Sequence, residues 1–212
     1  MKLAAVDIGS NAIRFQITHV TFYEGEYYFK RLEYVRFPLR LGEDAFMYRE
    51  IRSVCADKLI KLMHAFQLLI ELYEVDDYYA CATSAMREAS NGGALTKKIK
   101  QLFGLKIHII DGRQEAALVL RVIKKEFPNQ CFLHIDVGGG STELNLVTED
   151  RHVASQSFKL GSVRNRNEND EAHTFKEMRQ WLKEKVKSPI MCIGTGGNIS
   201  KIYELSGNKS SA

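Results

Sequence analysis

Two carboxylates flank a run of small residues in the second half of the chain. Asp136 follows the apolar stretch 131–135, and Glu143 lies just beyond a turn that consists of Gly138, Gly139, Gly140 and Ser141. Residues without a Cβ let main-chain N–H groups approach a ligand closely, and successive amides form an anion-binding concavity. Carboxylate oxygens suit a divalent metal. The pattern indicates a site for phosphate and metal, although an ordinary glycine hairpin has the same composition.

The same pattern occurs near the N-terminus, at a constant offset along the chain. Asp7 aligns with Asp136, and apolar, strand-like residues flank both turns. Arg14 takes the position that Glu143 holds in the second copy. The first turn itself consists of Gly9, Ser10 and Asn11. A repeated strand, Asp, glycine turn and strand predicts two similar half-domains, each with a phosphate loop.

A third glycine turn lies close to the end of the sequence. The short apolar run 190–193 predicts a strand, and residues 194–198, which include Gly196, lead from it into a helical pattern. A glycine loop between a strand and a helix N-terminus is a typical place for a phosphate or another anion. The chain therefore carries three candidate phosphate loops.

Arg87 and Glu115 are the remaining candidates for chemistry. Arg87 falls in the first turns of a short helix predicted after Thr83, and its guanidinium would fit phosphate oxygens. Glu115 falls near the start of another predicted helix, where a carboxylate can serve as a general base for water. Taken alone, each has an ordinary alternative, a surface arginine and a helix N-terminal charge that complements the helix dipole.

Other kinds of chemistry find no support in the residue spacing. The six histidines form no HxxxH-type pair, so a histidine metal site is not predicted. Ser10 and Ser141 lie in glycine turns, but no GxSxG sequence surrounds either one, so a nucleophilic serine is not predicted.

Composition predicts a globular protein that favours anionic ligands. The chain has 212 residues, 45% of them hydrophobic, and a net charge of +4. No dense Lys/Arg block predicts specific nucleic-acid binding, and no apolar run of about 18 residues predicts a membrane span. Four cysteines without metal-ligand spacing are expected to be reduced core thiols of a cytoplasmic protein. Whether the protein is a homodimer stays open.

Periodicity gives the order of the elements. Strand-like runs predict two β-meanders, one at residues 3–8, 12–20 and 26–37 and one at 131–135, 142–147 and 152–158. Helical spacing predicts helices at 50–73, 83–89, 94–103, 113–126 and 174–186. Residues 40–43 and the polar stretch 164–171 are expected to be loops. Pro128 ends a predicted helix just before the second meander, so we expect one domain over 1–128 and a shorter or incomplete one over 129–212.

Five ordered motifs give the chain a family resemblance. They are residues 5–11, 82–89 with Asn91 and Gly92, 111–116, 135–143 and 194–197. Together they closely resemble the exopolyphosphatase / guanosine pentaphosphate phosphatase family, a branch of the actin-like superfamily. The resemblance covers the whole chain. It implies an α/β fold of two ribonuclease-H-like (actin-like) domains, with a phosphate-binding cleft between them.

The resemblance also implies residue roles. Glu115 matches the family's general base, and Arg87 matches an arginine that contacts the phosphate chain. Acidic residues that the family uses around Mg²⁺ and the attacking water match Asp136 and Glu143, with Asp7 as a further metal ligand. Residues that match the phosphate loops are Ser10, Asn11, Gly138, Gly139, Gly140, Ser141 and Gly196.

The activity so implied is release of terminal phosphate from inorganic polyphosphate or a guanosine polyphosphate by direct attack of water. The chain departs from the family at Gln114, where the residue is usually acidic, and at Ala117, where it is often arginine. Two alternatives stay open. One is a non-catalytic sensor that binds polyphosphate or an alarmone, and the other is a nucleotide-binding, kinase-like member of the superfamily.

Overall fold

The computed structural model divides into two compact units, residues 1–110 and 111–212. It describes residues 1–148, 153–164 and 168–207. The division falls before the helix α5 (Gly112–Glu126), not after it as Pro128 suggested. Pro128 does follow the end of this helix, but Leu120 and Ile123 pack against Phe132 of the second unit. The packing of its apolar face therefore assigns α5 to the second unit.

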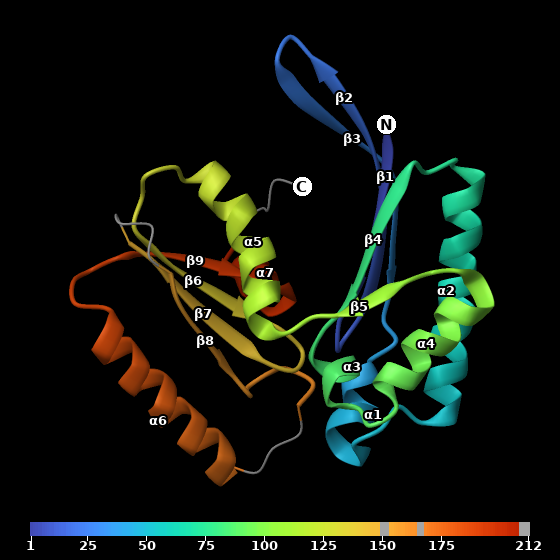
Figure 1. Cartoon of the computed structure of the whole chain (residues 1–212). Coiled ribbons are helices and arrows are strands. Elements are labelled where there is room, and N and C mark those ends of the chain that lie inside the picture. Colours follow the sequence, from blue (N-terminus) through green and yellow to red (C-terminus); the bar gives the residue numbers. More distant parts are fainter. Residues whose placement is uncertain (149–152, 165–167, 208–212) are drawn as a thin grey trace. The chain divides into compact units, whose positions relative to one another are not determined.

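The first unit is built on a five-stranded sheet with the order β3-β2-β1-β4-β5 (Figure 1). Its strands are β1 (Lys2–Ile8), β2 (Ile13–Tyr23), β3 (Glu26–Phe37), β4 (Asp77–Ala82) and β5 (Ile107–Ile109). The first three are antiparallel, which confirms the predicted meander, and β4 and β5 join in parallel. A β-bulge interrupts the pairing of β2 with β3 at Ile17/Thr18.

The helices of the first unit enclose its core. They are α1 (Leu41–Tyr48), α2 (Ser53–Leu72), α3 (Ser84–Glu88) and α4 (Gly92–Phe103). Phe66 of α2 stacks on Phe15 of β2 with ring centroids 4.6 Å apart. The loop predicted at 40–43 is wrong from Leu41 onward, because α1 begins there and buries Leu41 and Ala45 one turn apart. A helix of two turns shows too few periods to stand out in the sequence.

The second unit repeats this topology with the strand order β8-β7-β6-β9. Its strands are β6 (Phe132–Val137), β7 (Thr142–Val147), β8 (Val153–Phe158) and β9 (Met191–Thr195), and its further helices are α6 (Glu168–Lys185) and α7 (Gly197–Leu205). As in the first unit, three strands are antiparallel and the fourth is parallel to the first of them. The two half-domains inferred from the repeated motif therefore share one strand order, and the predicted α/β fold is confirmed.

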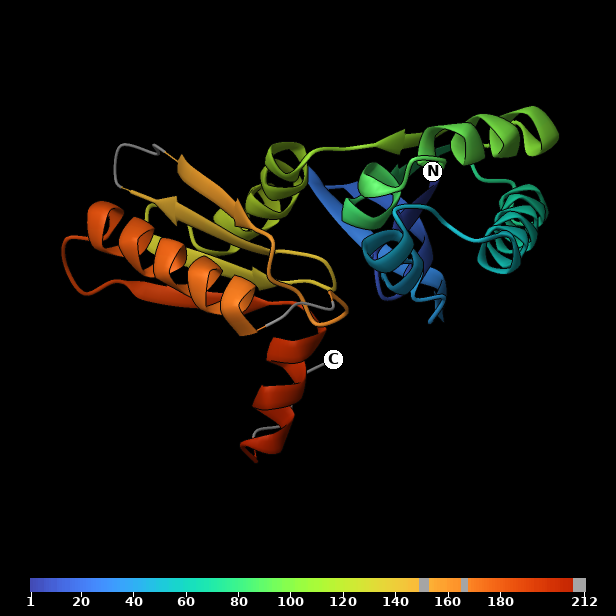
Figure 2. The same cartoon turned by 90° about the horizontal axis from the view of Figure 1, so that it is seen from below.

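Each face of the second sheet has its own helix. Helix α5 packs on the side of Phe132 and Val147, while α6 packs on the side of Leu133 and Leu144 (Figure 2). The polar stretch 164–171 is helical from Glu168, and residues 165–167 lie outside the described residues, as does position 152 of the predicted third strand. Met178, Trp181 and Leu182 of α6 pack on the sheet, whereas Phe175 is exposed.

Two predictions from composition concern membrane spans and the cysteines. Within the described residues, no helix is long and apolar enough to span a membrane. The four cysteines are free thiols, as expected, but none is fully buried: Cys55, Cys81 and Cys131 are half-buried, with Cys55 packed against the core, and Cys192 is exposed.

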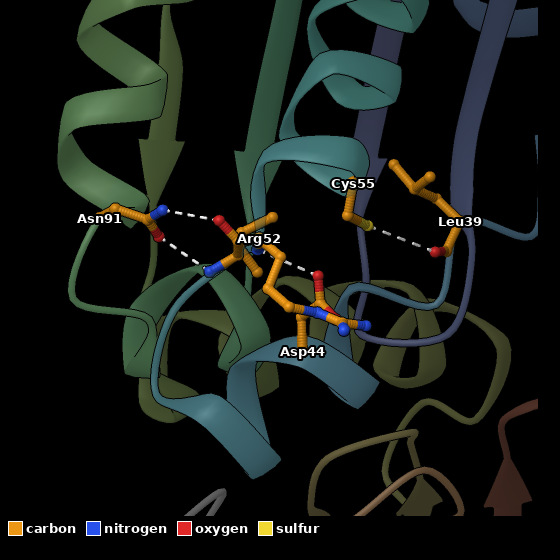
Figure 3. A network of polar contacts seen from close by, with 6 residues as sticks. Leu39, Asp44, Arg52, Cys55 and Asn91 are labelled. Carbon is orange, nitrogen blue, oxygen red and sulfur yellow. Dashed lines mark hydrogen bonds and ion pairs between the residues drawn. The ribbon is translucent and has the colours of Figure 1, made fainter.

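A polar network joins three helices of the first unit (Figure 3). The buried carboxylate of Asp44 on α1 accepts hydrogen bonds from the backbone N–H of Arg52, at 3.0 Å, and from its Nε, at 2.7 Å. Before α4, the Asn91 side chain accepts from the N–H of Ile51, at 2.9 Å, and donates to its carbonyl, at 2.7 Å. Gly92 is required beside it, because an added Cβ would lie 2.0 Å from the Met86 carbonyl oxygen. The Asn91-Gly92 motif thus has a structural role.

Replacing Asn91 by alanine is expected to lower the free energy of unfolding by about 1–3 kcal/mol, because both main-chain groups of Ile51 lose their partner. Urea denaturation followed by circular dichroism measures the change. Lys98→Ala, at an exposed position of α4, is the matched control. Equal stability of the two variants would contradict a structural role for Asn91.

Candidate active site

The glycine turn between β6 and β7 is held from one side. The N–H of Gly138 donates to the Ser141 carbonyl at 2.9 Å, which closes the turn. The N–H groups of Ser162 and Val163 donate to the carbonyls of Gly138 and Gly139, at 3.1 and 2.8 Å. Arg164 Nε donates to the Gly140 carbonyl at 2.6 Å. Because these carbonyls are fixed by one segment, the peptide planes of the turn are fixed too, and such planes can present their amides to an anion.

Asp136 and Glu143 lie directly opposite each other in the pairing of β6 with β7. Side chains at opposed positions of neighbouring antiparallel strands lie on the same face of the sheet, with Cβ atoms about 4.5–5.5 Å apart. Glu143 is only 6% exposed. Its Oε1 accepts a hydrogen bond of 2.9 Å from the hydroxyl of Ser157, the residue opposite it on β8. Sequence reasoning missed Ser157, although the predicted third strand of the meander placed it one strand away.

The third glycine turn packs against the Asp136 carboxylate. Gly196 has a φ of +98°, and a Cβ there would lie 2.5 Å from the Val137 carbonyl oxygen and 3.0 Å from Asp136 Oδ1. Thr195 is the register partner of Asp136 across β6 and β9. The second unit therefore brings three predicted site residues, Asp136, Glu143 and Gly196, to one end of its sheet.

Beside this end lies a buried histidine. His134 Nε2 is 2.8 Å from Thr195 Oγ1, and its Nδ1 is 3.1 Å from Asn145 Nδ2. Burial lowers the pKa of His134, and the nearby Asp136 charge only partly opposes that shift. From the sequence, the histidines were considered only as metal ligands, so this hydrogen-bond network was not predicted.

Glu115 stands half-buried in the first turn of α5, and a capping box fixes that turn. The N–H of Gln114 donates to Asp111 Oδ1 at 2.8 Å, and Gln114 Oε1 accepts from the N–H of Asp111 at 3.0 Å. A glutamine closes this box as well as a glutamate does. Gln114 therefore preserves the local geometry although it lacks the usual charge.

A pocket of about 370 Å³ lies between the start of α5 and strand β7, which carries Glu143. Its lining comes from the start of α5 and from the strands β7 and β8: Asp111, Gly112, Arg113, Ala116, Glu143, Asn145, Ser155, Gln156 and Ser157. Glu115 belongs to the same helical turn as Arg113 and Ala116. The turn that carries the predicted base thus adjoins the predicted metal ligand Glu143.

The first unit carries the other copy of the motif with a different charge pattern. Asp7 forms an ion pair of 2.9 Å with Arg14, its register partner on β2. Ser10 is buried, and its hydroxyl lies 2.8 Å from that of Ser84. Backbone hydrogen bonds tie the loop to the start of α1: Gly42 N–H donates to the Ser10 carbonyl at 2.8 Å, and Arg40 N–H donates to that of Asn11 at 2.9 Å.

Arg87 is half-buried in α3 and also belongs to the first unit. Its Nη1 donates to the Ile110 carbonyl at 2.7 Å. This bond fixes one end of the guanidinium group. Contact of Arg87 with a phosphate chain stays a prediction.

The acidic end of the second sheet suits a divalent cation. Within the described residues, no group of three or more His, Cys, Asp or Glu side chains could hold a metal. Asp136 and Glu143 supply an all-oxygen pair, and Mg²⁺ is commonly bound through one or two carboxylates plus water and substrate phosphates. These two residues therefore fit the metal that the resemblance implied. Asp7, paired with Arg14 in the other unit, stays a prediction as a ligand.

A family comparison decides the relationship. The profile of the Ppx/GppA phosphatase family matches residues 24–210. The chain belongs to this family. Among curated proteins, the bifunctional 3-dehydroquinate synthase/phosphatase of Fusobacterium nucleatum is 27% identical over 87% of this chain and 30% of its own length. Exopolyphosphatase 1 of Mycobacterium leprae is 26% identical over 77% of this chain and 48% of its own length. The chain thus spans less than half of either relative.

Solved structures of similar proteins share the fold. The Ppx-GppA enzyme of Aquifex aeolicus superposes with a TM-score of 0.77 at 25% identity, covering 99% of this chain and 72% of that one. An exopolyphosphatase from Cytophaga hutchinsonii gives a TM-score of 0.80 at 22% identity, covering 97% of this chain and 70% of that one. The two-domain, actin-like architecture is therefore confirmed.

Gly196→Ala is expected to lower the free energy of unfolding of the second unit by at least about 1–3 kcal/mol, because alanine is strained at a positive φ. Trp181, the only tryptophan of the chain, reports on this unit through its fluorescence in urea. Gly197→Ala is the matched control, since nothing lies within 4 Å of a Cβ at that position. If both substitutions left stability unchanged, the close packing of Gly196 on Asp136 would be wrong.

Proposed function

We propose that the protein is a metal-dependent phosphohydrolase that releases terminal orthophosphate from inorganic polyphosphate or guanosine pentaphosphate by direct attack of water. The observation that carries the proposal is the placement of Asp136 opposite Glu143, beside two glycine turns. Opposed like charges on neighbouring strands are unfavourable. A divalent cation would neutralise the pair and would attract phosphate to the same place.

The contrast between the two copies of the motif supports this reading. In the first unit the position opposite the aspartate is Arg14, and Asp7 already has a cationic partner at 2.9 Å. In the second unit that position is Glu143. The same backbone therefore carries an internal cation in one copy and two acids in the other. The second copy therefore concentrates carboxylate oxygens, the ligand type that Mg²⁺ prefers, where the first copy has an ion pair.

Mg²⁺ is the ion that we propose for this place, with Asp136 and Glu143 as its protein ligands. Once bound, it would stabilise the negative charge that spreads over the phosphoryl oxygens during transfer. The Ser157 hydroxyl holds one oxygen of Glu143 in place. A ligand whose other atoms are hydrogen-bonded keeps its orientation, which raises metal affinity. Ser157 therefore orients Glu143 in this proposal.

The remaining roles follow the chemistry of each side chain. Glu115 would remove a proton from the attacking water, since a half-buried carboxylate at a fixed helix start can act as a general base. The amides of the turn 138–141 and of Gly196 would bind phosphate oxygens. Arg87, Ser10 and Asn11 of the first unit are proposed as further phosphate-binding residues.

Two further elements of the proposal rest on other observations. A relative from Mycobacterium leprae is named exopolyphosphatase 1, which supports polyphosphate as a substrate. Guanosine pentaphosphate as a substrate rests on the family resemblance, and one assay can compare it with polyphosphate.

Four free thiols suit a reducing compartment, so a cytoplasmic location is part of the proposal.

Glu115→Gln is expected to slow orthophosphate release by about 10²–10⁴-fold at saturating Mg²⁺, the usual contribution of a general base. A phosphate-release assay on polyphosphate and on guanosine pentaphosphate measures it. Glu126→Gln, in the last turn of the same helix, is the control and should keep the parent rate.

Equal rates for Glu115→Gln and the parent would remove Glu115 as the base. Tight binding of polyphosphate by the parent without turnover at any Mg²⁺ concentration would instead favour the non-catalytic sensor.

A further inference from the structure

A buried polar chain crosses three strands beneath the acidic end of the second sheet. His134 on β6 is 0% exposed and Asn145 on β7 is 1% exposed. This polar chain consists of two contacts. Asn145 Nδ2 is 3.1 Å from His134 Nδ1, and His134 Nε2 is 2.8 Å from Thr195 Oγ1 on β9. On one side of these residues the sheet face is apolar, with Phe132 and Val147, and on the other side it leads to Asp136 and Glu143. Buried polar side chains at such a position call for a structural or functional explanation.

Each hydrogen bond of this polar chain has a donor and an acceptor, which follow from the chemistry of the side chains. In the structure the amide nitrogen of Asn145 faces the ring, and in this orientation His134 Nδ1 accepts and carries no proton. The neutral ring then carries its proton on Nε2 and donates it to Thr195 Oγ1. Since that oxygen accepts from the ring, the threonine hydroxyl keeps its own proton for a different acceptor. Neutrality of the ring follows here from its hydrogen bonds.

Thr195 stands where such a proton is useful. It is half-buried, lies opposite Asp136 in the strand register and immediately precedes Gly196 in the third glycine turn. The Asp136 carboxylate packs against that same glycine. A hydroxyl that donates at this point would be next to an anion bound by the turn.

We propose that Thr195 is a phosphate-binding residue and that His134 is its positioning residue, which holds the threonine hydroxyl as a donor to a phosphate oxygen. This inference rests on the proposed function, because it assigns a further contact within the same phosphate site. Asn145 acts one step further away by fixing the tautomer of His134.

This orientation of the Asn145 amide leaves one buried polar atom without a hydrogen bond. Asn145 Oδ1 is buried and has no hydrogen-bond partner within the described residues. With its amide turned round, Asn145 would accept from a protonated Nδ1, and Nε2 would then accept the proton of Thr195. In that arrangement the threonine hydroxyl would donate into the core. The tautomer of His134 therefore decides between a hydroxyl that serves the ligand and one that does not.

The kinetic test is a double-mutant cycle on the full chain, with polyphosphate as substrate. Thr195→Val is expected to raise KM about 10-fold or more at similar kcat, the size expected for a hydrogen bond to a charged group. Thr195→Ser should restore the parent KM. His134→Phe should raise KM in the parent but add nothing further to Thr195→Val, because a positioning residue acts only through its target. Equal KM increases from His134→Phe in both backgrounds would overturn the proposal.

A second measurement does not depend on turnover or on a variant that folds. Nitrogen-15 NMR of the parent chain reads the two ring nitrogens of His134 and should find the proton on Nε2. A proton on Nδ1 would overturn the inference. A parent chain that releases no orthophosphate from either substrate would overturn the proposed function, while the tautomer would still decide the direction of the chain.

Discussion

Two carboxylates face each other across a pair of antiparallel strands, and the rest of the second unit is arranged around that unfavourable pair. Asp136 and Glu143 are brought together by the register of β6 with β7, which a one-residue slip would destroy. The apolar contacts of α5 and α6 on the two faces of the sheet hold that register. The core of the unit therefore fixes a concentration of negative charge at one end of its sheet.

The neighbouring groups complement this charge in different ways. Ser157 donates to Glu143, the glycine at 196 gives Asp136 room, and the segment after β8 fixes the carbonyls of the glycine turn. In the first unit the same backbone pattern places Arg14 against Asp7 and needs no outside cation. The two copies of the motif thus differ in charge, because Arg14 in the first copy takes the position of Glu143 in the second.

Much of this arrangement was predictable from short-range signals. Alternating apolar residues around a glycine turn define each meander locally, and the repeated Asp and glycine positions predicted two similar half-domains. The division of the chain was not predictable from Pro128, because the partner of Leu120 and Ile123 on α5 is set by packing. Helix α1 was too short to show its period.

The missed site residues share one cause. Ser157 contacts Glu143 only through the pairing of β7 with β8, and His134 reaches Asn145 and Thr195 only through two strand registers. No local pattern marks such residues.

Binding of a divalent cation by Asp136 and Glu143 can be measured with Mn²⁺ in place of Mg²⁺, followed by electron paramagnetic resonance. The parent chain should bind the ion at the acidic pair, whereas Glu143→Arg, which copies the Asp7–Arg14 pattern, should fold normally and bind none in the same concentration range. Equal Mn²⁺ affinity of the two chains would contradict the account.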